Sequence, residues 1–140
     1  MTIKVRYSVN IHQPIATVFA AAIDLANLPR WSNVRDVRRV SSNPLKLGTT
    51  FQLVSHLGGE DRLVDCKVTT LVAPRKFTYV SDGPGKSEIG FELQPLDDRT
   101  QLTYTVAVTV NVLVESLIKP ELDKQARLDL ERFVKLLNAP

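Results

Sequence analysis

The sequence has one cysteine, one tryptophan and no long apolar run, and each scarcity excludes a class of structure. Cys66 stands alone, so no disulfide can form within the chain, which favours a reducing compartment. No apolar stretch is long enough to cross a bilayer, and we expect no stable membrane insertion. The opening MTIKVRYSVN alternates polar with apolar residues, and we expect no signal peptide. Together these absences predict a cytoplasmic protein.

The composition is that of a globular protein with a mild positive charge. A chain of 140 residues, 44% hydrophobic and 24% charged, suffices for a single domain over residues 1–140 with one sizeable core. Part of the net charge of +3 gathers in Arg30, Arg35, Arg38 and Arg39. This arginine cluster could meet phosphate or an acidic partner, but nothing elsewhere continues it. A solvated rim is the simpler interpretation, and we expect no nucleic-acid partner.

Seven segments alternate polar with apolar residues, as in a strand with one buried face. Short connections rich in glycine, proline and aspartate separate the later strands, which predicts antiparallel neighbours because parallel ones need long crossovers. The expected strands cover residues 3–11, 34–41, 49–57, 62–72, 76–81, 86–94 and 100–111.

Helical spacing appears in two parts of the chain. Pro14 suits the first position of a helix over IATVFAAAI, and Asp24 can cap a second short helix that Pro29 stops or bends. Trp31 therefore lies where the short helices meet the sheet. From residue 114 to 137 apolar residues recur every three or four positions, which predicts a long amphipathic helix with Pro120 kinking or starting its main part.

This order of elements predicts an α+β fold in which a seven-stranded curved antiparallel sheet wraps a long C-terminal helix. Only the concave side of such a sheet has to be apolar, which explains why nearly every strand has one polar face. The sheet cannot close around the helix at both ends. We therefore predict an apolar cavity between sheet and helix, with Trp31 plugging or lining its opening.

Several segments resemble a known family over essentially the whole chain. They include LKLGTTF, LVAPRKFTY and LDLERFVKLL, and motifs at Pro14-Val18-Phe19, at Asp24-Pro29-Trp31 and at Gly48-Thr49. The chain resembles the polyketide cyclase/dehydrase and lipid-transport family of the START-like (SRPBCC) superfamily, which has the helix-grip fold. The resemblance implies a lipid, sterol, quinone, hormone or polyketide as ligand. Some members cyclise or dehydrate their ligands, and others only carry them.

The inward-facing positions of the expected strands supply the candidate ligand site. Most are apolar, with a few polar points, which is the usual chemistry of a small-molecule pocket. Each of these side chains could equally fill a core without any function. The candidate ligand-binding residues are Trp31, Phe51, Ser55, Cys66, Tyr79, Phe91 and Tyr104.

Few inward positions titrate, which favours a carrier of a small hydrophobic molecule (a lipid, polyketide, quinone or other isoprenoid) over an enzyme. The resemblance to cyclases implies the alternative, acid–base catalysis of ring closure and loss of water. In that case Tyr79 and Tyr104 could hold an enolate oxygen, and Arg62 could polarise a carbonyl if it faces inward. No catalytic residue is assigned. A third hypothesis is a partner protein bound by the arginine cluster.

The remaining reactive side chains point to no further chemistry. We expect His12, at the end of the first strand, and His56, on the outer face, to be exposed rather than catalytic. Their separations from Cys66 match no metal site, so we expect neither metal nor cofactor. Cys66 lacks a neighbour that would activate its thiol, and the acidic pairs at 60–61 and 97–98 fit solvated turns. A homodimer is left open.

Overall fold

The computed structural model describes residues 2–57, 59–83, 85–111 and 115–138, and it confirms the expected order of elements. Strand β1 (Thr2–Ile11) leads into helix α1 (Ile15–Ile23), a short 3-10 helix η1 (Leu25–Asn27) and helix α2 (Leu28–Trp31). Six strands and the long helix α3 follow: β2 (Val34–Arg38), β3 (Thr50–Leu57), β4 (Glu60–Val72), β5 (Lys76–Asp82), β6 (Lys86–Leu96), β7 (Arg99–Thr109) and α3 (Glu115–Asn138).

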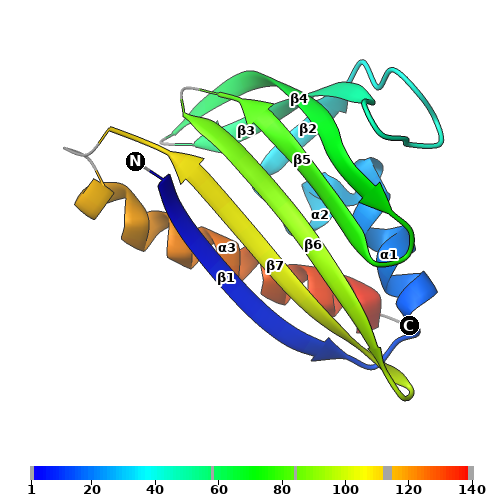
Figure 1. Cartoon of the computed structure of the whole chain (residues 1–140). Coiled ribbons are helices and arrows are strands. Elements are labelled where there is room, and N and C mark those ends of the chain that lie inside the picture. Colours follow the sequence, from blue (N-terminus) through cyan, green and yellow to red (C-terminus); the bar gives the residue numbers. More distant parts are fainter. Residues whose placement is uncertain (1, 58, 84, 112–114, 139–140) are drawn as a thin grey trace.

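All seven strands form one antiparallel sheet in the order β1-β7-β6-β5-β4-β3-β2. The sheet lies in front of α3 in Figure 1, and α1 and α2 lie behind it at the end where β1 finishes. Strands β1 and β2 are its two edges. Because β1 pairs with β7, the first and last strands of the chain lie side by side. The fold is α+β with the helix-grip arrangement, as the sequence predicts.

The burial of the strands follows the period of two that the sequence shows. Along β7, Leu102, Tyr104 and Val106 are buried, whereas the residues between them are partly exposed. Their partners on β6, Phe91 and Leu93, are buried as well. The buried residues of all strands therefore share the face that carries α3, and the hydrophobic effect holds this helix against the sheet.

Local sequence signals, as well as burial in the core, determine where the helices begin. Pro14 precedes α1, and Asp24 caps η1 by accepting a hydrogen bond from the Ala26 amide at 3.2 Å. Pro29 lies in the first turn of α2 instead of stopping that helix, because a missing N–H is tolerated there. Helix α3 runs through Pro120 near its start, and residue 114, the expected start, lies outside the described residues.

Most strand boundaries differ from the expected ones by one to three residues, and those of β2 and β4 have a clear physical reason. Strand β2 ends at Arg38, because Arg39 adopts a left-handed backbone with φ of 52° that cannot continue an extended strand. Glu60 and Asp61 open β4 instead of forming a turn, since Asp61 pairs with His56 across the strands. The other acidic pair, Asp97-Asp98, lies in the turn between β6 and β7, as expected.

Candidate functional site

Trp31 lies inside the core between the short helices, the sheet and α3. Only 2% of its surface is exposed. Its ring centroid is 5.1 Å from that of Phe133 on α3, 5.9 Å from Phe91 on β6 and 6.1 Å from Tyr104 on β7, all nearly edge to face. These contacts join three parts of the fold, and edge-to-face packing is the favoured geometry for such rings.

The other aromatic candidates extend the same wall across the sheet. The ring centroids of Phe51 and Tyr79 are 5.3 Å apart. Phe77 lies between Tyr79 and Phe91, with its ring centroid 5.8 Å from that of Tyr79 and 6.0 Å from that of Phe91. The structure thus brings six of the seven predicted residues together in one buried core: Trp31, Phe51, Cys66, Tyr79, Phe91 and Tyr104. Their role in ligand binding stays a prediction.

Two predicted polar residues differ in position. Cys66 is buried opposite Phe51, and burial raises the pKa of its thiol to about 11, so the thiol stays protonated and is a poor nucleophile. Ser55 is half-buried at the far end of β3, where it pairs with Val34 and Arg62. The inward orientation considered for Arg62 is wrong: it lies near the start of β4, exposed and 3.8 Å from Glu60.

Asp129 on α3 is a buried carboxyl that the sequence analysis missed. Only 5% of its surface is exposed, and it is the sole buried charged residue in the described part of the chain. Its Oδ1 accepts a hydrogen bond from Gln125 Nε2 at 2.6 Å. Burial raises the pKa of the carboxyl from 3.8 to about 7, although the Gln125 bond and the charge of Arg132 lower it.

A signal for Asp129 was present in the sequence. Position 129 is three residues after Ala126 and four before Phe133, both buried on the inner face of α3. A charged residue therefore stands within the apolar stripe of the helix, where burial is costly unless function or bonding compensates for it.

Tyr79 and Tyr104 are buried in the same core, close enough for the charge of Asp129 to act on their phenols. Burial raises the pKa of both phenols, and the charge of Asp129 raises each of them further. Among the described residues, Trp31 Nε1 is the one fully buried side-chain nitrogen or oxygen atom without a hydrogen-bond partner. We call Asp129, Tyr79, Tyr104 and Trp31 the polar centre. Its Trp31 N–H is unpaired, and the rings of Phe91, Tyr104 and Phe133 surround that of Trp31.

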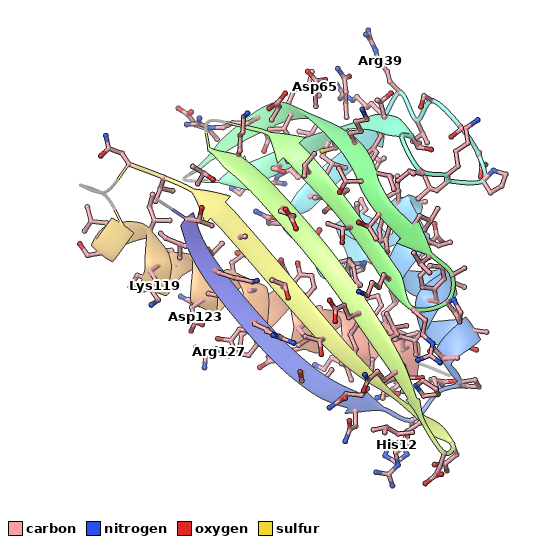
Figure 2. All side chains as sticks on the ribbon, in the orientation of Figure 1. His12, Arg39, Asp65, Lys119, Asp123 and Arg127 are labelled. Atoms are coloured by element: carbon pink, nitrogen blue, oxygen red, sulfur yellow. The ribbon has the colours of Figure 1, made fainter. Side chains whose placement is uncertain are left out.

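A groove of about 440 Å³ follows the seam between β1 and α3, next to the interior. Tyr7 and Val9 on β1 and Leu130 and Val134 on α3 form its apolar lining. The Tyr7 hydroxyl donates a hydrogen bond to Asp123, which lies 3.8 Å from Arg127. Figure 2 shows Asp123 and Arg127 on the part of α3 that β1 borders. The groove lies at the edge between sheet and helix and is open to solvent, and none of the seven predicted ligand-binding residues lines it.

A larger hollow of about 800 Å³ is lined by residues of β1 and β3–β7, and these include the predicted residues Phe51 and Cys66. Most of the residues that line it are polar, and the charged ones include both signs. Figure 2 shows two of them, Arg39 and Asp65, at the end of the molecule away from His12. The charged residues of the hollow are Arg39, Asp65, Lys67, Asp82, Lys86 and Glu88.

The histidines and arginines lie at the surface. His12 is exposed, and His56 Nδ1 lies 2.9 Å from Asp61. Within the arginine cluster, Arg35 pairs with Asp61 at 3.1 Å and Arg38 with Asp36 at 2.8 Å. Among the described residues no group of three potential ligands could hold a metal ion, and none of the helices there is long and apolar enough to cross a membrane.

Comparison with known proteins agrees with this architecture. The sequence model of a family described as polyketide cyclase/dehydrase and lipid transport matches residues 2–139. No curated protein matches the chain. The Zhui aromatase/cyclase from Streptomyces sp. R1128 is similar in structure, with 14% sequence identity, 98% of this chain and 94% of that one covered, and a TM-score of 0.82. TTHA0849 from Thermus thermophilus has 16% identity, 98% of both chains covered and a TM-score of 0.80. A START superfamily protein from Mycobacterium smegmatis has 20% identity, 96% of this chain and 93% of that one covered, and a TM-score of 0.73.

Proposed function

Since the chain belongs to the polyketide cyclase/dehydrase and lipid-transport family, we propose that it binds one small, mostly apolar ligand between the concave face of the sheet and α3. The polar centre carries this proposal. A buried donor without a partner costs about 1–3 kcal/mol, and Trp31 Nε1 is such a donor in the same core as the buried carboxyl of Asp129. An oxygen atom of a ligand would satisfy this donor, while the aromatic walls would bind the apolar part of the ligand.

The groove at the β1–α3 seam is the proposed route to this site. Tyr7, which lines the groove, pairs in register with Tyr104 of the polar centre. Leu130, on the opposite wall, directly follows Asp129. The aromatic rings already fill much of the interior, so the ligand would enter as α3 moves away from β1, with loss of the Tyr7–Asp123 hydrogen bond.

Trp31 provides a direct test of binding, because it is the only tryptophan and lies within the proposed site. We expect a saturable change in tryptophan fluorescence, with one molecule bound per chain, when the protein is titrated with an apolar probe such as methyl laurate. Native mass spectrometry of the same mixture should show the one-to-one complex.

The control variant is Leu117→Ala, which removes an apolar side chain that is 73% exposed near the start of α3. This substitution should leave the titration unchanged, whereas binding to the exposed helix end would be weakened by it. Absence of any fluorescence change and of any complex, with the protein shown to be folded by circular dichroism, would contradict the proposed function.

A second candidate is an enzyme of the cyclase/dehydrase kind, and Asp129 favours it. A general acid or base works best when its pKa lies near the working pH, and the carboxyl of Asp129, with a pKa of about 7, meets that condition. The two phenols beside it could hydrogen-bond an enolate oxygen as negative charge develops there.

Catalysis can be tested with a poly-β-ketone mimic and the variants Asp129→Asn, Tyr79→Phe and Tyr104→Phe. If Asp129 transfers the proton, the first variant should form cyclised product about 100-fold or more slowly, since general acid–base groups contribute roughly that much. Leu117→Ala should keep the wild-type rate. The same product spectrum and rate in all four variants would exclude the enzyme and leave the carrier.

A further inference from the structure

We propose that the free edge of β1 binds an extended segment of a partner protein, in which acidic side chains alternate with apolar ones, as a further strand of the sheet. This inference goes beyond the proposed function, because no residue of the polar centre lines the groove beside β1. Three features of this edge support it: a regular strand, an apolar groove and a basic outer face.

The two edges of the sheet differ in how well they are protected against pairing. Strand β2 has five residues and a register shift between Val34 and Asp36. Strand β1 has ten residues, contains no proline and pairs with β7 without a register shift. Short strands, bulges and prolines are common protections of sheet edges, and β1 has none of them. Its outer side therefore offers the backbone groups of a regular strand to a further strand.

The groove of about 440 Å³ lies along this edge and would receive one side of the added strand. In Figure 1, β1 forms the border of the sheet and α3 passes behind it. Side chains of a strand alternate between its two faces, so those on the side of α3 would pack among Tyr7, Val9, Leu130 and Val134. This apolar lining selects apolar residues at every second position. The groove is also the proposed route of the ligand, and a bound strand would cover it.

The charges of the outer face select the other side chains of the added strand. Strands β1 and β7 contain the cations Lys4, Arg6 and Arg99 and no acidic residue. Lys4 and Arg6 are exposed, and neither takes part in an ion pair with a described residue. Acidic side chains on the added strand would lie beside them, and opposite charges on neighbouring strands stabilise the pairing.

The helix side of the groove adds no excess of either charge. Arg127 and Lys135 are basic, Glu131 is acidic, and Asp123 lies 3.8 Å from Arg127. The preference for an acidic partner therefore depends on β1. A second copy of the chain fits this edge less well, because its own β1 would bring further cations and no acidic residue to the seam.

Fluorescence anisotropy with a short labelled peptide that alternates glutamate with valine tests the proposal. We expect this peptide to bind and a lysine–valine peptide of the same length not to bind. Two further peptides carry N-methyl groups, one on the valine nitrogens and the other on the glutamate nitrogens. Only one set of alternate N–H groups faces a neighbouring strand, so just one of these two peptides should lose binding.

The protein variant for this test is Arg6→Glu. We expect it to raise the Kd of the glutamate–valine peptide about fivefold, the effect of one exposed ion pair. The control Lys46→Glu makes the same change in charge at an exposed residue of the loop between β2 and β3, and it should keep the wild-type Kd. Circular dichroism of both variants checks that they are folded.

Equal binding of the lysine–valine peptide, or an equal effect of the two N-methylated peptides, would overturn the proposal without the use of any variant. An unchanged Kd in folded Arg6→Glu would overturn it as well. A native mass spectrum that shows a dimer of the chain and no peptide complex would assign this edge to a second copy instead.

Discussion

Replacing Phe133 by alanine is expected to lower the free energy of unfolding by about 3–5 kcal/mol, the range for removing a buried aromatic ring. Phe133 is completely buried, and its ring contacts Trp31 at 5.1 Å and Phe91 at 5.9 Å between centroids. The substitution would leave a cavity where α3, α2 and the sheet meet. Equilibrium unfolding in urea, followed by circular dichroism, measures the loss.

The matched control for this prediction is Leu117→Ala on the same helix. Leu117 is 73% exposed, so its truncation should change the free energy of unfolding by less than about 0.5 kcal/mol. Similar unfolding midpoints for the two alanine variants would show that α3 is not held to the sheet through Phe133.

The second large effect concerns the pH dependence of stability and Asp129. Because burial raises the pKa of its carboxyl, the folded protein binds this proton more strongly than the unfolded chain does. The resulting stabilisation is complete below pH 3.8, the ordinary pKa, and is lost as the pH rises through about 7. Between pH 5 and pH 8 the wild type should lose about 2.5 kcal/mol that Asp129→Asn does not lose.

Urea unfolding of both proteins at pH 5 and at pH 8 tests this difference. Every other titrating group is common to the two proteins, so the comparison isolates Asp129. Asparagine keeps the size of the side chain and an oxygen that can accept the hydrogen bond from Gln125. Parallel pH profiles for the two proteins would mean that the Asp129 carboxyl is solvated rather than buried.

Local pattern was enough to predict the fold. The alternation in β7 and the spacing of three or four in α3 each reflect one buried face, and these periods belong to single elements. Short turns then implied antiparallel neighbours, which the sheet confirms. The concave aromatic residues Phe51, Tyr79, Phe91 and Tyr104 followed from the same alternation, since residues two apart on a strand share a face.

What surrounds a side chain could not be predicted in this way, because contacts between distant segments depend on how the elements pack. Arg62 has the parity of a buried residue, yet its place at the end of β4 leaves it exposed. The place of Asp129 in the apolar stripe of α3 marks it as unusual in the sequence, but only the packing of that helix onto the core buries its carboxyl and puts it within reach of the phenols of Tyr79 and Tyr104. Sequence periodicity thus determined which face of each element is apolar. The tertiary structure decided which polar groups share the interior, because that depends on distances between residues of different elements.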